Sequence, residues 1–343
     1  MRLRAASCSS ACAMAWKTIW QKDPNLFISL QIKRHENGEI DLHQTTYINE
    51  AIKMLETDIG RPLTPCPTPF VAGKKLTKIT DPEIARQQMV RTNPVFSHYK
   101  YLGILNWLVS TTRLDIMVAT SFVAAHTATF GIEHYQALLR IFGYLKKYAG
   151  NILRFGRKQT EMLLTDGVER LAVGERPIEL YADAGFANDT LGKKGKGSVL
   201  GHVLFAFGSP VIWYAKRCKI TCTSTTEAEL MSLAAAIKSA SWARGLFEDI
   251  FAVSAGEIPI AEDNNGAEIN ARGPVKWSTS RHFAIDVQYV REEVKNGMVT
   301  IWHCNTNDMI ADFFTKPLAE DLFLTHLRKM MIVVESSPKL ESA

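Results

Sequence analysis

The second half of the chain carries the pattern that most restricts its fold. Three strand-like apolar runs, separated only by short turns, occupy residues 176–186, 198–208 and 210–222. Strands linked this closely predict an antiparallel meander. The expected elements after it are a helix from about Thr226, a strand at 258–263, a helix at 282–297, a strand at 298–303 and a helical region at 307–316. This order predicts an α/β (α+β) unit, a mixed sheet flanked by helices.

The first half has a different character. Residues 26–43 alternate around Asn37-Gly38, a dipeptide typical of a tight hairpin turn. Residues 45–60 have helical spacing and end on glycine, whereas residues 61–73 are too rich in proline for a helix or central strand. Three further apolar helices are expected at 94–112, 114–128 and 132–150. We place the boundary between the halves between Gly150 and Arg176.

Length and composition fit a globular protein of about two domains. The chain has 343 residues, 46% of them hydrophobic, and a net charge of +5, which permits a polyanionic partner without requiring one. It has no run of 18 apolar residues, so no membrane association is expected. Residues 1–16 faintly resemble a transit peptide, but we favour a ragged N-terminus at 1–19 without a targeting signal.

The cysteines indicate a reduced protein, which we expect in the cytoplasm, the nucleus or both. Six cysteines do not make a dense disulfide framework in a chain of this size. Cys218 and Cys222 would share one face of a continuing strand, where His303 could complete a metal site. Packing of the two thiols as small apolar groups is the favoured alternative.

Four acids stand where elements begin or end: Asp183, Glu229, Asp263 and Asp312. Asp183 and Asp263 follow apolar strands, where an unpaired carboxylate is costly. Carboxylates that converge on one point are commonly used to hold hard divalent cations. Each acid taken alone would more often be a surface charge.

The helix near residue 226 can begin in two frames, since Ser224-x-x-Glu227 and Thr226-x-x-Glu229 both fit a capping box. Glu229 shares a helix face with Leu233 and Ala236, which points toward the sheet. We therefore assign the cap to Glu227 and the metal to Glu229.

Seven sequence blocks stand in an order that resembles a known family. They are YADAGFAND, SVLGHVLF, SPVIWYAKR, STTEAEL, EDNNGA, RHFAIDVQYVREEV and ADFFTKPL. This order is similar to the ribonuclease H domain of copia-type retrotransposon Pol polyproteins. FISLQIKR, IDLHQTTYINEAI, CPTP, HYKYLGILNWLVSTTRLDIMVA and RIFGYLKKYAGNILRF resemble the end of the preceding reverse transcriptase region.

The resemblance implies a fold and an activity. It implies a ribonuclease H-like mixed sheet at 176–318, preceded at 20–155 by a hairpin and a helical thumb/connection-like domain, with a C-terminal helix and tail at 319–343. The implied reaction is hydrolysis of the RNA strand of an RNA:DNA hybrid with two Mg²⁺ ions, for which Mn²⁺ can substitute. Asp183 would bridge the ions, Glu229 and Asp263 would complete one, and Asp312 the other.

Substrate contacts are expected from basic and hydroxyl side chains. The candidates are Lys193, Lys194, Lys196, Lys216, Arg217, Ser224, Thr225 and Asn264. The bland alternatives are a solvated lysine loop and ordinary helix caps. An intact reverse transcriptase is a further candidate partner.

Some family features are absent or altered. The paired aspartates of the polymerase site would precede Trp20 and are not found, so we expect no polymerase activity from this chain alone. Leu114 replaces a proline, Gln31 a glycine and Ala284 an aspartate of the family pattern. A rival hypothesis is therefore an inactive remnant that binds nucleic acid or supports a separate polymerase.

Overall fold

The structure, a computed structural model, describes residues 23–93, 96–156, 178–189, 197–218, 220–251, 254–273 and 284–335. The strands are β1 Leu26–Phe27, β2 Leu30–Arg34, β3 Ile40–His43, β4 Leu153–Phe155, β5 Ile178–Asp189, β6 Gly197–Ala206, β7 Ser209–Arg217, β8 Ile258–Glu262 and β9 Val299–His303. The α-helices are α2 Thr45–Ile59, α3 Pro82–Thr92, α4 His98–Thr111, α5 Met117–Ala124, α6 Ile132–Lys147, α7 Thr225–Phe251, α8 Asn265–Arg272, α9 Ala284–Lys295 and α10 Glu320–Met330. The short 3₁₀ helices are η1 Leu114–Ile116, η2 Thr127–Thr129, η5 Thr306–Asp308 and η6 Ile310–Phe314.

The first sheet contains the predicted hairpin. β2 and β3 pair antiparallel, and Gly38 adopts φ 87° in the turn between them, a conformation that glycine tolerates at no steric cost. β4, which follows α6 in the chain, pairs with β3, and the strand order of the sheet is β1-β2-β3-β4. The alternating segment from residue 26 is divided into β1 and β2, because Ile28 and Ser29 adopt positive φ and fold β1 back on β2.

The helices of the first half follow the predicted pattern with one omission. α2 ends at Gly60, which caps it at φ 67°, and α4, α5 and α6 lie within the three predicted helical segments. α3 was not predicted, although its signal is present in the sequence. The Asp81 side chain caps the helix by accepting a hydrogen bond from Glu83 N. Pro82 is the first helical residue, a position at which proline is common.

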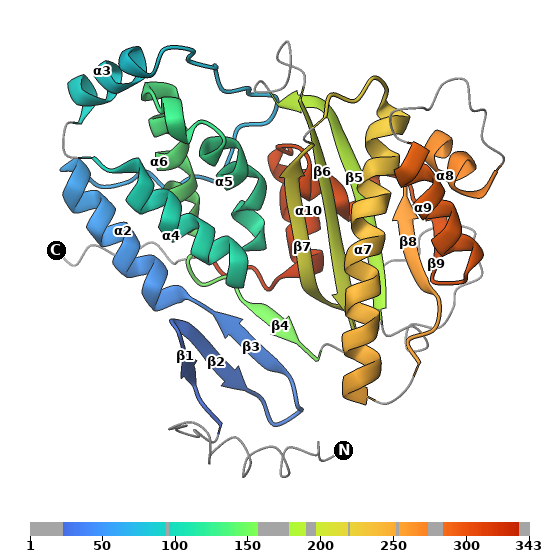
Figure 1. The fold of residues 1–343 in the computed structure, drawn as a ribbon. Helices are drawn as coiled ribbons and strands as arrows, with labels where there is room; N and C mark the ends of the chain where they lie inside the picture. The colour runs from blue at the N-terminus through green and yellow to red at the C-terminus, as the bar shows by residue number, and fades with distance from the viewer. Residues whose placement is uncertain are drawn as a thin grey trace, which may run out of the picture.

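The second sheet is mixed, as predicted. Its strand order is β7-β6-β5-β8-β9, with the β5-β6-β7 meander antiparallel and β8 and β9 parallel to β5. α7 packs against β5 and β6 on one face of this sheet, and α9 packs beside α7 (Figure 1). η6 lies against β5 and β6, and α5 of the first half contacts β7.

Three details of the second half correct, refine or extend the predictions. β7 ends at Arg217, so Cys218 and Cys222 do not lie on one strand. Residues 307–316 are helical, as predicted, and consist of η6 and part of η5, both 3₁₀ helices. α8 was also missed, although Asn264 caps it by accepting a hydrogen bond from Ala267 N at 3.0 Å.

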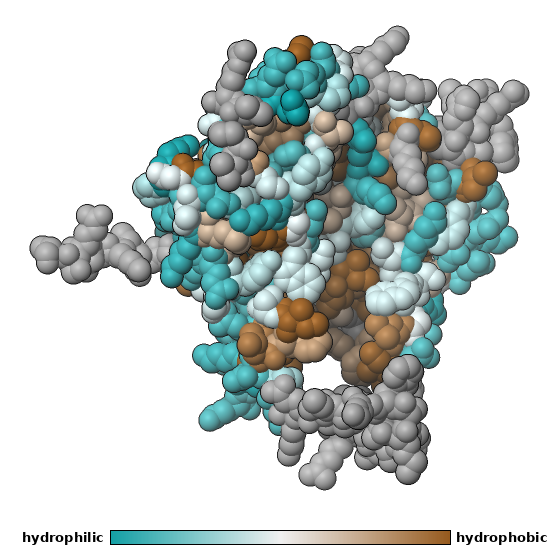
Figure 2. Space-filling view, turned by 60° about the vertical axis from the view of Figure 1, so that its left-hand side comes forward, coloured by the Kyte–Doolittle hydropathy of each residue, from teal (hydrophilic) through white to brown (hydrophobic). Residues whose placement is uncertain are grey.

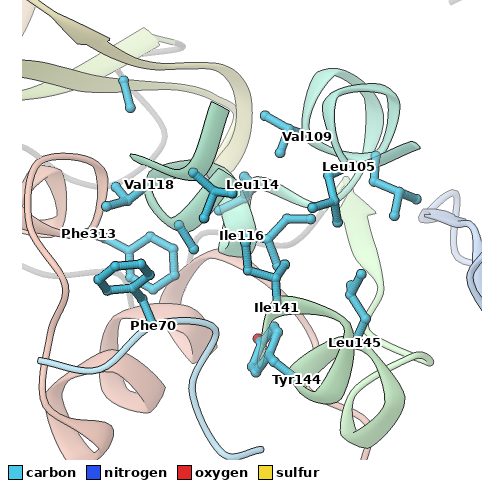
Figure 3. Packing of buried hydrophobic residues seen from close by; sticks show 14 of the residues in the cluster. Phe70, Leu105, Val109, Leu114, Ile116, Val118, Ile141, Tyr144, Leu145 and Phe313 are labelled. Carbon is cyan, nitrogen blue, oxygen red and sulfur yellow. The ribbon is translucent and has the colours of Figure 1, made fainter. Parts of the chain in front are cut away.

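Two large clusters of buried apolar residues hold the described parts together. One lies under α7 and joins β5, β8 and β9 to α9. The other fills the first half and extends to η6, so that Phe313 belongs to the same cluster as Phe70 and Ile141 (Figure 3). The segment after β9 is therefore anchored in the first half as well as on the second sheet.

The C-terminal segment also returns to the first half. Ile332 forms an antiparallel bridge with Ile152, and Phe323 of α10 packs edge-on against Tyr144 of α6.

On the face drawn in Figure 2, hydrophilic residues cover most of the surface and hydrophobic ones gather near its lower edge. Among the described residues, no helix combines the length and apolarity needed to cross a membrane.

Candidate metal centre

The register of the second sheet brings two of the predicted acids together. Tyr181 of β5 pairs with Ala261 of β8 in parallel. Asp183 and Asp263 each lie two residues further along, so both side chains point to the same face at the same level. This face is the one against which η6 packs, as the burial of Tyr181 and Ala261 in the cluster shared with η6 shows.

Glu229 reaches the same place from α7. Ligand oxygens of Asp183, Glu229 and Asp263 all lie within 4.8 Å of one another, an arrangement that can hold a metal ion. Asp183 and Glu229 are buried, and Asp263 is half-buried. The structure thus brings together three of the four predicted acids in one compact group.

The start of α7 explains why it carries two glutamates. Glu227 N donates to Ser224 Oγ at 3.1 Å, so Ser224 caps the helix. The Glu227 carboxylate accepts from the backbone N and hydroxyl of Thr223, one residue further back than in the predicted capping box. Glu229 is left to face the sheet, since Leu233 and Ala236 on its side of the helix are fully buried.

The fourth predicted acid, Asp312, lies next to Asp183. It lies on η6, close enough to Asp183 for the charge of Asp183 to raise the pKa of Asp312. Lys316 forms an ion pair with Asp312 Oδ1 at 2.6 Å, and Thr315 donates its hydroxyl to Asp183 Oδ2. Asp312 therefore stands beside the three-acid group, partnered by a lysine four residues on.

A fifth acid, Glu262, was not predicted. It is fully buried, its Oε1 accepts from Asn264 N at 3.0 Å, and its Oε2 has no hydrogen-bond partner among the described residues. Strand alternation could have revealed it, because Ile258 and Ile260 of β8 face α7 and Glu262 continues that series. Thr315 and Lys316 also went unnoticed, although Lys316 follows Asp312 at a helical spacing.

The electrostatics of the group are those of crowded, desolvated acids. Burial raises the pKa of Glu229 to about 11, with further contributions from the charges of Glu262 and Asp183. Burial and the neighbouring Asp183 raise the pKa of Asp312 to about 8. Burial also raises the pKa of Glu262. It raises the pKa of Asp183 as well, although the hydrogen bond from Thr315 opposes this shift. Neutral carboxyl groups are favoured here unless a cation compensates their charge.

The predicted substrate contacts that the structure describes lie on three different parts of the second half. Lys216 and Arg217 are exposed at the end of β7, and Ser224 and Thr225 are exposed at the start of α7. Asn264 Oδ1 is used in the α8 cap. Lys193, Lys194 and Lys196 lie outside the described residues.

The alternative Cys218–Cys222–His303 site is not supported, since His303 Nδ1 lies 4.0 Å from Glu268 instead.

Comparison with known proteins gives relatives over most of the chain. The chain is 28% identical over 311 residues, 89% of its length, to the retrovirus-related Pol polyprotein from transposon RE1 of Arabidopsis thaliana. It is 25% identical over 91% of its length to the corresponding polyprotein from transposon RE2 of the same plant. It spans only 19% of the length of each of these relatives. No family model matches the chain.

Among solved structures, LC11-RNase H1 isolated from compost matches 41% of this chain and 93% of its own length, with a TM-score of 0.31 and 18% identity. The full-length relatives are the more informative, because they cover both halves of the chain in one alignment. Over about nine-tenths of its length, the chain is similar to retrovirus-related Pol polyproteins of transposons, which confirms the copia-type Pol resemblance that its sequence blocks predicted.

Proposed function

We propose that the second half of this chain is a ribonuclease H that hydrolyses the RNA strand of an RNA:DNA hybrid with the help of Mg²⁺. The observation that carries the proposal is the convergence of Asp183, Glu229 and Asp263 within 4.8 Å, from three different elements. Similarity to Pol polyproteins over both halves supports the choice of an RNA:DNA hybrid as the substrate.

The residues present fit a hard divalent cation. All of the donors are carboxylate oxygens, which Mg²⁺ prefers. Glu229 Oε2 is buried without a hydrogen-bond partner among the described residues, and its pKa is raised by burial and by neighbouring acids. A bound cation would satisfy this oxygen and remove the repulsion between the acids.

In the proposed site Asp183, Glu229 and Asp263 would hold one ion, and Asp312 together with Asp183 a second. When bound, magnesium supplies charge stabilisation at the scissile phosphate and makes water a better nucleophile at neutral pH. Thr315 fixes the Asp183 carboxylate by its hydrogen bond, and Lys316 places a positive charge beside Asp312.

Substrate binding is proposed to be mainly electrostatic. Lys216 and Arg217 end β7, and Ser224 and Thr225 begin α7, the helix that carries Glu229. Basic side chains and the N-terminus of a helix both favour phosphate groups. The Asn264 side chain, whose oxygen caps α8, keeps an amide nitrogen that could donate to a 2′-hydroxyl.

The domain organisation is part of the same proposal. Residues 176–318 would form the ribonuclease H-like domain and residues 20–155 a thumb/connection-like domain. Support comes from the two separate sheets, one in each half, and from relatives that cover both. The buried cluster that joins η6 to the first half would fix the position of Asp312 relative to both proposed domains.

Cleavage of an end-labelled RNA:DNA hybrid with magnesium tests the proposal, beside Asp183→Asn, Glu229→Gln and a DNA duplex substrate. Glu248→Gln is the matched control, since Glu248 lies on the same helix about 28 Å further along. Loss of the RNA strand in the wild type and Glu248→Gln, but not in the other two variants, is expected. Hybrid binding without cleavage by the wild type would favour the inactive remnant instead.

A further inference from the structure

Three sulfur atoms meet at the junction between β7 and α7, away from the acids. Cys218 Sγ and Cys222 Sγ are 3.9 Å apart, and Met231 Sδ lies 3.8 Å from the first and 3.9 Å from the second. Both cysteines are free thiols and are buried. The three sulfurs thus form a nearly equilateral triangle.

The three sulfur-bearing residues come from the end of β7, the connection that follows it and α7. Cys218 directly follows β7, and its backbone N donates to Ser198 O at 2.8 Å, which continues the pairing with β6. Cys222 precedes the Ser224 cap of α7, and Met231 lies two turns into that helix. The end of β7 and the helix α7 thus fix two of the three sulfurs, and Cys222 lies in the short segment between them.

The size of the triangle suits a metal ion. The point equidistant from the three sulfurs lies about 2.2 Å from each, close to the usual metal–thiolate bond length of about 2.3 Å. The surroundings are mainly apolar, since Ala184, Leu200 and Ala228 pack in the same cluster as the cysteines. A cation could therefore be enclosed without moving the backbone.

The chemistry of the donors selects the ion. Two thiolates and a thioether are soft ligands, which prefer Cu(I) and offer little to magnesium or calcium. Structural zinc usually takes four ligands drawn from cysteine, histidine and carboxylate. In the described part of the chain, no acid or histidine joins the two cysteines in a three-residue metal-ligating group.

From this geometry we infer that Cys218, Cys222 and Met231 form a three-coordinate site for a single Cu(I) ion. Binding would form three copper–sulfur bonds and release two protons, one from each thiol, with no change of oxidation state. The site would tie the end of β7 to the first turns of α7, and it would do so independently of the proposed nuclease activity.

The test is anaerobic titration of the full reduced chain with Cu(I), in competition with the chelator bicinchoninate. We expect the wild type to hold one more equivalent than Cys218→Ser/Cys222→Ser, in which Cys8, Cys12, Cys66 and Cys304 remain as an internal control. X-ray absorption should then show three sulfur neighbours at about 2.2–2.3 Å.

Met231→Leu separates a metal site from simple packing, because it keeps the volume of the side chain and both thiols. It should bind Cu(I) at least about tenfold more weakly, with two sulfur neighbours left. Equal Cu(I) binding by the wild type and the double serine variant would overturn the inference. So would an unchanged affinity in Met231→Leu, or displacement of the bound Cu(I) by equimolar Zn²⁺. Circular dichroism of each variant confirms that it is folded.

Discussion

Thr315 donates a hydrogen bond from its hydroxyl to Oδ2 of Asp183, joining residues 132 positions apart in the chain. Asp183 stands on β5 of the second sheet, whereas Thr315 follows η6, which is buried against the first half. The carboxylate at the centre of the candidate site is therefore held by the segment that also carries Asp312.

Replacing Thr315 by valine should weaken this arrangement without changing the shape of the side chain. Asp183 would lose a hydrogen bond while remaining buried, so we expect unfolding to require about 1–3 kcal/mol less. Denaturant unfolding measures the change. Magnesium affinity should fall in the same variant, whereas Thr315→Ser should retain the hydrogen bond and the affinity.

Gly201 lies directly opposite Asp183 in the β5–β6 pairing and leaves room for the same segment. A Cβ at this position would lie 2.5 Å from Thr315 Cγ2 and 3.0 Å from Phe314 Cβ. Gly201→Ala should therefore destabilise the fold by about 1–3 kcal/mol and displace η6.

Gly245→Ala is the control for this substitution, because no atom lies within 4 Å of a Cβ built at that position of α7. It should stabilise the protein by about 0.5–1 kcal/mol, since alanine restricts the unfolded chain. An equally stable Gly201→Ala protein would mean that the close approach of η6 does not matter.

Magnesium should stabilise the protein through the acidic group. At 100 times its Kd, a single bound ion would add about 2.7 kcal/mol to the free energy of unfolding. Glu229→Gln should lose most of this gain, and it should be more stable than the wild type when magnesium is removed by chelation, because one buried acid is gone. Thermal unfolding with and without EDTA measures both effects, with Glu248→Gln expected to behave as the wild type.

The buried ion pair between Arg113 and Asp115 should be important for the first half. Arg113 Nη2 lies 2.6 Å from Asp115 Oδ2, both side chains are fully buried, and Tyr144 donates to the same oxygen at 2.8 Å. Asp115→Asn would leave the buried guanidinium without its countercharge, at a cost of about 3–5 kcal/mol. Urea unfolding checks this, and Arg113→Met/Asp115→Leu, which removes both charges, should recover part of the loss.

Acid should destabilise the protein through His202. Burial lowers the pKa of this histidine to about 4, while its Nε2 bonds to Ser239 Oγ at 2.8 Å. The unfolded chain takes up a proton near pH 6.5, whereas the folded chain does so only near pH 4. The stabilisation is therefore complete above pH 6.5 and declines as the pH falls toward 4, by at most about 3 kcal/mol.

The His202→Gln variant tests this dependence, since its amide can replace the hydrogen bond to Ser239 but does not titrate. Its unfolding free energy should fall less steeply between pH 6.5 and 4 than that of the wild type. Two parallel curves would show that another group causes the loss.

Local patterns in the sequence determined most of the elements. Apolar periodicity, the Asn37-Gly38 turn and Gly60 act over a few residues, so they predicted the first hairpin, α2 and the β5-β6-β7 meander correctly. They failed where a short-range signal was overlooked, as at Asp81-Pro82, or where the backbone turns unexpectedly, as at Ile28 and Ser29. The places of the four acids at the ends of elements singled them out, and the family resemblance, carried by the order of whole blocks, implied their roles.

Only the tertiary structure decided how those acids meet. The parallel register of β5 and β8 sets Asp183 beside Asp263, and the burial of η6 against the first half sets Asp312 near them. The structure also revealed Glu262, which strand alternation could have predicted, and it placed Met231 against Cys218 and Cys222, a contact that no spacing along the chain predicts. Contacts between segments so distant in sequence depend on strand register and on the packing of helices against the sheet, and neither is encoded in the pattern of any one segment.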